Sequence, residues 1–331
     1  MAPVSVPLFS RRFLTIAGKG GVGRTTVAAA MAIAAARAGK KVLVCQTKAK
    51  ERMSSMFGSP PIGDEIVKVR DRLWVVNMTP QTALREYGTM VLRSEFIAKQ
   101  VLENRVSRAF LHAVPGVEDY AMLGKAWFHT TEVEHGTNKY DLVILDGPAT
   151  GHILTLLAIP DAILAAVPEG PLTKPARETH DLLRDPRRSA FVVVTLAEDL
   201  PVNEAIELSK KATAMGLPPG PVVVNGLFPP RFRTGASAEG LRLLLGQDDG
   251  AALRTSDDPT LAVLVDSARL SERRRALHDR ELERLRIELP LPQLQLPYIF
   301  RTDQGPDGPS SSLAASVTEL ADRLEGQLRS V

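Results

Sequence analysis

Cysteine is almost absent from this sequence, and its scarcity limits the chemistry that the chain can carry out. The 331 residues include a single cysteine, Cys45. One thiol excludes an internal disulfide and is typical of a protein of the reducing cytoplasm. Because Cys45 lies in the apolar run 42–45, we expect it to be a buried structural residue rather than a ligand.

Long apolar runs are also missing. No stretch approaches the roughly 20 apolar residues that a membrane-spanning helix needs. Arg11 and Arg12 precede a short strand-like segment rather than the apolar core of a signal peptide. We therefore expect a cytoplasmic location, with neither export nor stable insertion into a membrane.

The sequence also lacks a strong charge of one sign. Its net charge is +3, with 24% charged and 44% hydrophobic residues, which is ordinary for a globular protein. Short basic runs occur at 184–188 and 273–275, but neither an aromatic platform nor a nucleic-acid-binding motif accompanies them. Such runs usually belong to solvated surfaces, so we expect no nucleic-acid partner.

A glycine-rich run, GKGGVGRTT, is present near the start of the chain at 18–26. Nucleotide-binding loops follow the pattern G-x-x-x-x-G-K-[ST], in which backbone N–H groups bind phosphate and the last hydroxyl binds magnesium. Gly18 and Gly23 occupy the fixed glycine positions, and Thr25 occupies the hydroxyl position. The residues predicted to contact a nucleotide here are Gly18, Gly20, Gly21, Val22, Gly23, Arg24, Thr25 and Thr26.

The segments that flank this loop agree with the motif. Residues 13–17 are apolar and predict a buried parallel strand, and the alanine-rich segment 27–37 predicts a helix that ends near Gly39. The N-terminus of such a helix directs free N–H groups toward a phosphate. The alternative, an ordinary glycine turn, is disfavoured by these flanks.

Arg24 stands where the pattern has lysine. Arginine keeps the positive charge and can bind phosphate oxygens, but its planar guanidinium is not a neutral replacement for a compact ammonium group. We expect nucleotide binding to survive this change and the rate of phosphoryl transfer to be the property at risk.

Strand and helix patterns alternate along the rest of the chain. Further strand-like segments lie at 42–45, 140–145, 190–196, 222–225 and 296–300. This alternation predicts an α/β fold, a P-loop NTPase with a doubly wound, mostly parallel sheet and helical insertions, with the nucleotide at the carboxyl ends of the strands.

The same alternation divides the chain into parts. Two segments with helical patterns interrupt the core, and a helix with leucine at helical spacing follows it. The charges on that last helix are mixed, which favours docking on the core or a partner over a membrane surface. The predicted core comprises 1–78, 135–230 and 290–310, the helical insertions comprise 79–134 and 231–289, and the C-terminal helix comprises 311–331.

Two further motifs point to a family. They are DGPATGH at 146–152, directly after a predicted strand, and AEDLPVNE at 197–204. With the loop at 18–26, they resemble the arsenite-pump ATPase and tail-anchored-protein-targeting ATPase family, a branch of the P-loop NTPases whose loop contains an extra signature lysine. The likeness is greatest to its compact bacterial members, some of which occur as pairs. The resemblance extends from about Phe13 to Gly308.

The resemblance implies roles for individual residues. Lys19 matches the signature lysine, which reaches the nucleotide of the opposite subunit across a dimer, and Lys19 and Asp146 are the implied catalytic residues. Thr25 and Asp146 match the groups that hold Mg²⁺, Asp146 through water. Asn225 matches the asparagine that contacts the base, and 297–307 the loop that packs over it. The implied cofactors are ATP and Mg²⁺.

Departures from the family pattern concern hydrolysis. In the family, an aspartate at the end of the second strand positions the attacking water, and alignment places Lys48 there, which cannot perform that role. Glu51 is three residues further on and should point elsewhere. Together with Arg24, Lys48 indicates a weak or inactive site. The single thiol also excludes the zinc clasp and the arsenite-binding cysteines of some members. In switch II, residues 146–152, His152 is expected to have a conformational role.

The insertion 79–134 occupies the place where targeting ATPases of the family form a groove for a hydrophobic client helix. Methionine suits such a groove, whereas an apolar helical stripe more often packs against the core. Both interpretations stay open. The apolar residues concerned are Met90, Leu92, Phe96, Ile97, Val101, Phe110, Met122 and Trp127.

We therefore predict an ATP-binding protein that is a homodimer or a heterodimer with a paralogous ATPase. It couples nucleotide-dependent closure of its switch to a partner or protein client and hydrolyses ATP weakly alone. One alternative is an inactive structural subunit that lends Lys19 to an active paralogue. Another is an active client-targeting ATPase. A DNA-segregation ATPase fits the two motifs less well.

Overall fold

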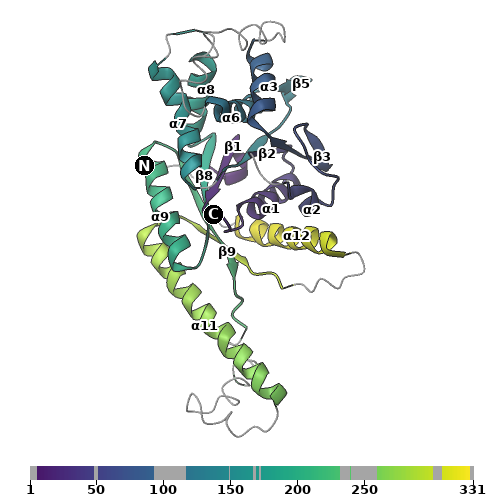
Figure 1. Ribbon diagram of the computed structural model, residues 1–331, viewed down its shortest axis with the longest axis vertical. Helices are drawn as coiled ribbons and strands as arrows, with labels where there is room; N and C mark the ends of the chain where they lie inside the picture. The colour runs from purple at the N-terminus through teal and green to yellow at the C-terminus, as the bar shows by residue number, and fades with distance from the viewer. Residues whose placement is uncertain are drawn as a thin grey trace.

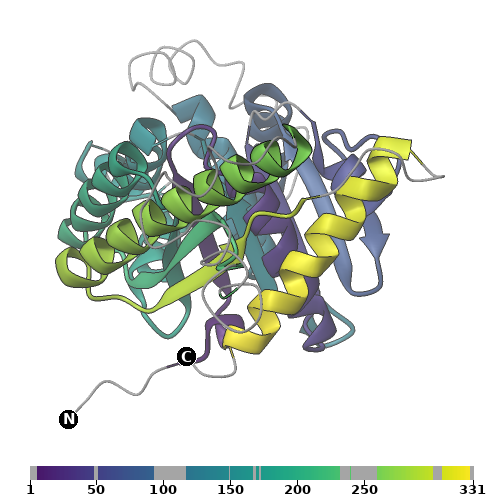
Figure 2. The same cartoon turned by 90° about the horizontal axis from the view of Figure 1, so that it is seen from below.

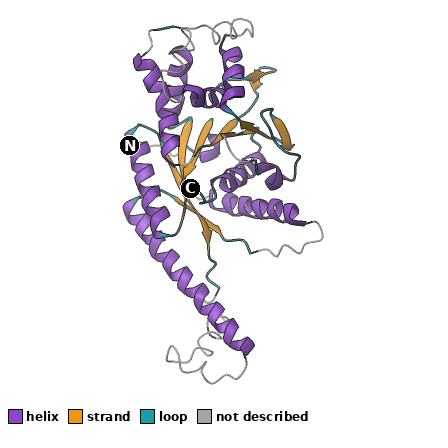
Figure 3. Ribbon diagram, in the orientation of Figure 1, coloured by secondary structure: helices purple, strands orange, loops and turns teal. Residues whose placement is uncertain are grey.

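The computed structural model describes residues 6–47, 51–92, 117–148, 150–166, 169–170, 173–231, 239, 259–300 and 308–328. Within these ranges the strands gather in a central sheet, and helices lie on both of its faces (Figure 1, Figure 3). A long helix extends away from the body of the molecule (Figure 1).

The main sheet has 8 strands in the order β10-β9-β8-β1-β7-β2-β4-β3. Neighbouring strands are parallel except β3 and β4, which are antiparallel. Because β1 is interior and the chain adds strands on both sides of it, the predicted doubly wound, mostly parallel sheet is confirmed. The strands are β1 Phe13–Gly18, β2 Val42–Thr47, β3 Val67–Arg70, β4 Leu73–Met78, β7 Leu142–Asp146, β8 Ser189–Leu196, β9 Pro219–Leu227 and β10 Gln293–Pro297.

One face of the sheet is covered by α1 (Arg24–Arg37), α2 (Met53–Phe57) and α12 (Gly308–Leu328). Alanine makes up most of the buried surface of α1, so the helix can lie close to the strands and to α12. The buried residues of α12 come from the predicted helical spacing and include Val317 and Leu324. Figure 2 shows α12, in yellow, lying along α1.

The opposite face is covered by helices of the first predicted insertion and by helices after β7. These are α3 (Pro80–Leu92), α6 (Val117–His129), α7 (Thr150–Ala166) and α8 (Thr173–Arg184). Met122 and Trp127 are buried in this layer, and the rings of Tyr87 and Tyr120 meet edge to face with centroids 5.9 Å apart, a spacing typical of aromatic pairs.

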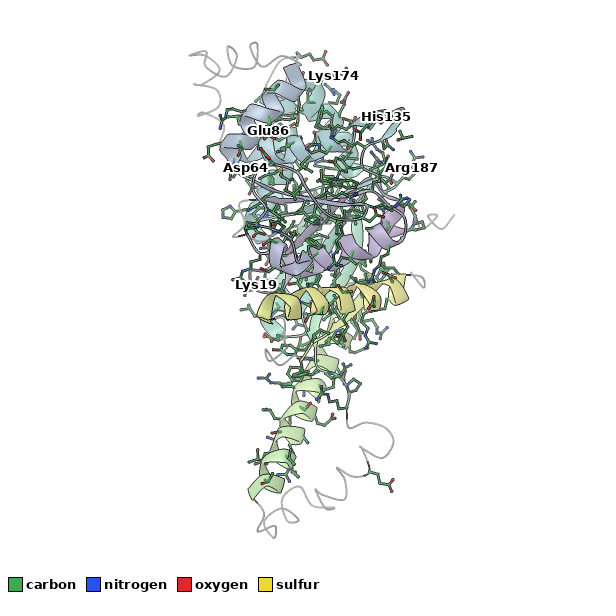
Figure 4. The ribbon with its side chains drawn as sticks, turned by 90° about the vertical axis from the view of Figure 1, so that its right-hand side faces the viewer. Lys19, Asp64, Glu86, His135, Lys174 and Arg187 are labelled. Atoms are coloured by element: carbon green, nitrogen blue, oxygen red, sulfur yellow. The ribbon has the colours of Figure 1, made fainter. Side chains whose placement is uncertain are left out.

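An ion pair joins two helices of the same layer. Lys125 of α6 is 2% exposed and pairs with Glu86 of α3, which is labelled in Figure 4.

Of the residues proposed for a client groove, Met122 and Trp127 pack inside the protein, and Met90 is half-buried. Phe96, Ile97, Val101 and Phe110 lie outside the described residues, as does the side chain of Leu92.

A third cluster lies at the β9 side of the sheet, where α9 (Asp199–Ala214) and α11 (Pro259–Glu288) pack together. Leu285 and Leu289 near the end of α11 are buried, whereas Val263 and Leu270 near its start are 65% and 57% exposed. The start of α11 is the part that extends away from the sheet (Figure 1). Among the residues described, no helix combines the length and apolar character needed to cross a membrane.

Several predicted boundaries were wrong. The strand predicted at 296–300 is β10, Gln293–Pro297, because Leu294 and Leu296 face the core while Tyr298 and Phe300 are half exposed. The helix after the loop begins at Arg24 rather than at residue 27. Strands β3 and β4 were not predicted. The insertion predicted as helical ends in a short hairpin of β5 (Val133–Glu134) and β6 (Thr137–Asn138).

Candidate nucleotide-binding site

The glycine-rich loop connects the end of β1 to the start of α1, at the carboxyl edge of the sheet. Gly18 has φ +154, and a Cβ there would lie 2.3 Å from the carbonyl oxygen of Val194 in β8. Gly23 has φ +89 and directly precedes α1. A side chain at either position would force the loop away from the sheet, so glycine is required by the close approach and by the backbone conformation.

Asn225, near the end of β9, supports this loop from the side. Its Nδ2 donates a hydrogen bond to the carbonyl oxygen of Val22 at 2.9 Å, and a Cβ on Gly23 would lie 2.2 Å from the same nitrogen. The amide that the family resemblance assigns to a base therefore contacts the loop backbone here. Sequence analysis placed Asn225 at the site but did not predict this contact.

Thr25 and Asp146 meet below the loop. Thr25 Oγ1 donates a hydrogen bond to Asp146 Oδ2 at 2.8 Å. Asp146 is the last residue of β7 and is 3% exposed. Burial raises the pKa of its carboxyl group, while the hydrogen bonds from Thr25 and Gln46 and the charge of Arg24 oppose that rise.

Gln46 is a polar residue of this site that sequence analysis missed. It is fully buried in β2, in register with Asp146 of β7, and its Nε2 lies 3.4 Å from Asp146 Oδ2. Its Oε1 is buried and accepts no hydrogen bond from any described residue. A glutamine inside an otherwise apolar strand was the only sequence signal, since burying such a group is costly without partners.

These groups fit a magnesium ion bound together with a nucleotide. Mg²⁺ prefers oxygen ligands, keeps several waters and usually takes only one or two protein ligands beside substrate phosphates. Thr25 and Asp146 supply a hydroxyl and a carboxylate, and Gln46, whose Nε2 contacts Asp146, has a buried Oε1 without a partner among the described residues. Over the described ranges, no group of three or more His, Cys, Asp or Glu forms another metal site.

Arg24 contacts the first residues of switch II. Its Nη1 donates a hydrogen bond to the carbonyl oxygen of Gly147 at 2.7 Å and a second to that of Pro148. The guanidinium is half-buried, and burial lowers its pKa, while the charge of Asp146 opposes that change. The residue that replaces the loop lysine is therefore bound to the protein backbone in this structure.

Lys19 contacts a helix of its own chain. Its Nζ lies 2.7 Å from Glu204 Oε1 in α9, and the two side chains are 32% and 31% exposed. Figure 4 shows Lys19 at the margin of the core. Glu204 is the last residue of the AEDLPVNE motif, so this contact links the glycine-rich loop to the second motif of the sequence.

Only part of the expected switch residues is described. Lys48 lies outside the described residues. Glu51 accepts hydrogen bonds from Ser54 N at 2.8 Å and from Ser54 Oγ at 2.6 Å, in the first turn of the short helix α2. His152 is exposed near the start of α7.

Aromatic rings gather beyond the ends of β9 and β10. Tyr298 stacks on Phe228 with ring centroids 5.6 Å apart, and Tyr298 and Phe300 are 50% and 52% exposed. The guanidinium of Arg274 lies 5.2 Å from the centroid of Phe228, and that of Arg231 lies 4.8 Å from Phe300. The expectation that no aromatic platform accompanies the run 273–275 was therefore wrong, because these rings are distant in sequence.

Comparison with known proteins agrees with this geometry. The family model of the anion-transporting ATPases matches residues 11–169, which include the loop, Gln46 and switch II. ATPase BagA of Mycobacterium tuberculosis is 30% identical over 226 residues, 66% of this chain and 66% of that protein. A putative arsenical pump-driving ATPase of Halobacterium salinarum is 31% identical over 255 residues, 72% of this chain and 39% of that protein.

The chain belongs to the anion-transporting ATPase family. ATPase GET3B of Arabidopsis thaliana, 24% identical over 269 residues that make up 66% of this chain and 65% of the plant protein, is a more distant member. The resemblance to the arsenite-pump and tail-anchored-protein-targeting ATPases is thereby confirmed. The chain spans just under two thirds (66%) of the mycobacterial relative's length and 39% of the halobacterial one. Membership of this ATPase family supports nucleotide binding.

Proposed function

We propose that this chain binds Mg·ATP at the loop 18–26 and hydrolyses it weakly when alone. The observation that carries the proposal is the hydrogen bond from Thr25 to Asp146 directly below the N-terminus of α1. The adjacent hydroxyl and carboxylate support the proposal, because a cation on the outer phosphates of a nucleotide needs oxygen ligands. The N–H groups of the loop and the first turn of α1 bind the phosphates.

The residues of the site divide the work of holding the nucleotide. Thr25 Oγ1 and the carboxylate of Asp146 would hold the magnesium ion. Gln46, whose Nε2 contacts Asp146, would supply a further acceptor through its buried Oε1, which has no partner among the described residues. When bound, the ion neutralises charge that develops on the phosphates. Asn225 keeps the loop in shape through its contact with Val22.

Weak hydrolysis follows from the groups that surround the phosphates. Arg24 donates to backbone carbonyls of switch II, so a phosphate must compete with them for its guanidinium. Glu51 accepts hydrogen bonds from Ser54 and is not free to act on an attacking water. The alignment puts Lys48 where a water-positioning carboxylate is needed. Slow turnover keeps the nucleotide bound for longer. This suits a protein that acts in its closed, nucleotide-bound state.

We further propose that a partner protein recognises the closed state of switch II. The chain forms a dimer, either with a second copy or with a paralogous ATPase, and Lys19 leaves Glu204 to reach the nucleotide of the other subunit. A structural subunit without turnover of its own is the second candidate, supported by the same positions of Arg24 and Glu51. A client-targeting ATPase is the third, and it requires a client site in the helices above the sheet.

Titration with a fluorescent ATP analogue tests the binding step. Wild-type chain should bind the analogue more tightly in magnesium than in EDTA. Thr25→Val should reduce this metal-dependent gain in affinity about tenfold, since a direct ligand and a hydrogen bond to Asp146 are both removed. Thr26→Val is the comparison, because Thr26 lies in the same turn of α1 and should leave the metal dependence intact. Equal affinity of wild type in magnesium and EDTA contradicts the proposal.

Phosphate release tests the hydrolysis step. The chain alone should turn over below about 1 s⁻¹, the lower end of common enzyme rates. A faster rate that Asp146→Asn abolishes overturns weak hydrolysis and favours the client-targeting ATPase. A rate that rises only on addition of a paralogue, and that falls when this chain carries Lys19→Ala, supports the heterodimer.

A further inference from the structure

Arg24 belongs to the glycine-rich loop, and its side chain contacts switch II. It is the first residue of α1, and it reaches the two carbonyl oxygens that directly follow Asp146, those of Gly147 and Pro148. The contact joins residues 123 positions apart in the sequence. Both hydrogen bonds come from Nη1, one nitrogen of the planar guanidinium, whose two N–H donors serve the two neighbouring acceptors.

The backbone that Arg24 binds is also held from the other side. The N–H of Gly147 donates to the carbonyl oxygen of Ile16 in β1 at 3.2 Å. A Cβ on Gly147 would lie 2.5 Å from the side chain of Ile153 in α7. Gly147 is thus held by contacts with β1, α7 and Arg24. Loss of the guanidinium contact removes one of the three.

The two possible partners of Arg24 differ in charge. A peptide carbonyl is neutral, whereas a phosphate oxygen is anionic, so the phosphate adds a Coulomb attraction to the guanidinium that the carbonyl lacks. In a half-buried site this difference is larger than in water, because the effective dielectric constant is lower. A bound phosphate at the loop therefore competes for the same guanidinium.

We propose that Arg24 is a positioning residue that holds the start of switch II in the nucleotide-free chain and exchanges the carbonyls of Gly147 and Pro148 for phosphate oxygens when a nucleotide binds. The exchange step rests on the proposed function, because it needs a nucleotide at the loop. Arginine at the lysine position then adds a function to the loop. Its contact with the two carbonyl oxygens couples phosphate binding to the release of switch II.

Hydrogen–deuterium exchange of the full chain tests the contact without any nucleotide. Arg24→Lys should speed exchange in peptides that cover Ile153–Leu157 by about tenfold, as expected for the loss of one charge-assisted hydrogen bond. Arg24→Gln replaces the guanidinium by a shorter, neutral amide and should give the same result if the lysine variant folds poorly. Arg37→Lys is the matched control, because Arg37 ends the same helix and pairs with Asp322 and Glu325 on the far surface.

The same peptides with a saturating non-hydrolysable Mg·ATP analogue test the exchange of partners. The difference between wild type and Arg24→Lys should shrink below about twofold, because neither side chain then holds the carbonyls. No difference in the nucleotide-free state overturns the contact. A difference that persists with the analogue bound assigns Arg24 a purely structural role and overturns the exchange.

Failure of the proposed function is distinguishable from failure of this inference. Binding of the analogue is measured separately by titration of the wild-type chain. If no binding is detected, the proposed function and the exchange of partners both fail. The nucleotide-free comparison of wild type, Arg24→Lys and Arg37→Lys still decides whether Arg24 holds switch II.

Discussion

Lys19 of the glycine-rich loop and Glu204 of α9 form an ion pair within one chain, with Nζ 2.7 Å from Oε1. Both side chains are about one third exposed, at 32% and 31%, so solvent and salt screen the pair and it adds little to folding stability. Its effect is on charge, because a carboxylate beside the loop neutralises a lysine that a phosphate or a partner's nucleotide would otherwise attract.

Removing that carboxylate should strengthen nucleotide binding. Glu204→Gln leaves Lys19 without its counter-charge, so we expect ATP affinity to rise about three- to tenfold at low salt and the gain to fall as salt is added. Titration with a fluorescent ATP analogue at two ionic strengths measures both. Glu207→Gln is the control, since Glu207 lies on the same helix and pairs with Lys211 on the surface. Unchanged or weaker affinity in Glu204→Gln contradicts this prediction.

Gln46→Leu should separate stability from metal binding. The buried Oε1 has no partner among the described residues, and leucine of similar volume removes that unsatisfied oxygen. Because leucine also removes the Nε2 hydrogen bond to Asp146, we expect the unfolding free energy of the metal-free chain to change by less than about 1 kcal/mol and the magnesium-dependent gain in ATP affinity to fall about tenfold. Thermal unfolding and titration with and without magnesium provide the two measurements. A lower melting temperature together with an unchanged metal dependence shows that Gln46 is only a packing residue.

Acidification should weaken the region around Phe228 through His278. Phe228 N donates to His278 Nδ1 at 3.2 Å, which requires the neutral ring on that side. Burial and then the charges of Arg275 and Arg274 lower the pKa of His278, while Glu198 and Asp279 oppose them. A histidine whose folded pKa is lowered takes up its proton more readily in the unfolded chain. Unfolding free energy is therefore lost as pH falls from the ordinary histidine value, about 6.5, through the lowered folded value.

His278→Asn should remove that part of the pH dependence, because asparagine keeps an acceptor near the Nδ1 position and does not titrate. Urea unfolding of wild type and variant at pH 7 and at pH 5.5 measures it. His135→Asn is the control, since His135 has φ 50, which asparagine tolerates, and lies in the exposed turn between β5 and β6. An equal loss of stability in wild type and His278→Asn refutes the assignment.

Cys45 should react slowly with alkylating reagents in the folded chain. Burial raises the pKa of its thiol to about 12, and the thiolate is the reactive form. At pH 8 we expect labelling by iodoacetamide to be at least about 100-fold slower than in urea, where the thiol has an ordinary pKa near 8.5. Mass spectrometry of timed samples measures both rates. Equal rates would mean that β2 opens on the labelling timescale.

The sequence was sufficient where structure is set by neighbours along the chain. The run 18–26 specifies a strand–loop–helix unit by local chemistry, and the apolar segments around Val143 and Val193 specify buried strands. Contacts between residues that are distant along the chain could not be predicted from the sequence. The distance in sequence is 185 positions for Lys19 and Glu204, and 123 for Arg24 and Gly147, and no local pattern encodes either pair.

Other misses have similar causes. Strand β3 lies at the edge of the sheet, next to β4, and is half-buried, so its composition differs from that of the interior strands. The rings of Phe228, Tyr298 and Phe300 meet only because β9 and β10 are paired in parallel and end at the same edge. Gln46 is informative only when Asp146 is known to be its neighbour.

The position of α12 on α1 has a consequence for the order in which this protein matures on the ribosome. α12 follows every other described element along the chain, yet Val317, Leu320 and Leu324 bury the alanine-rich helix that begins with Arg24 and Thr25. Until residues 308–328 have emerged, the apolar surface that α12 covers stays open to water, and a nascent chain has an incomplete support beneath its glycine-rich loop. We therefore expect firm nucleotide binding only after translation of α12.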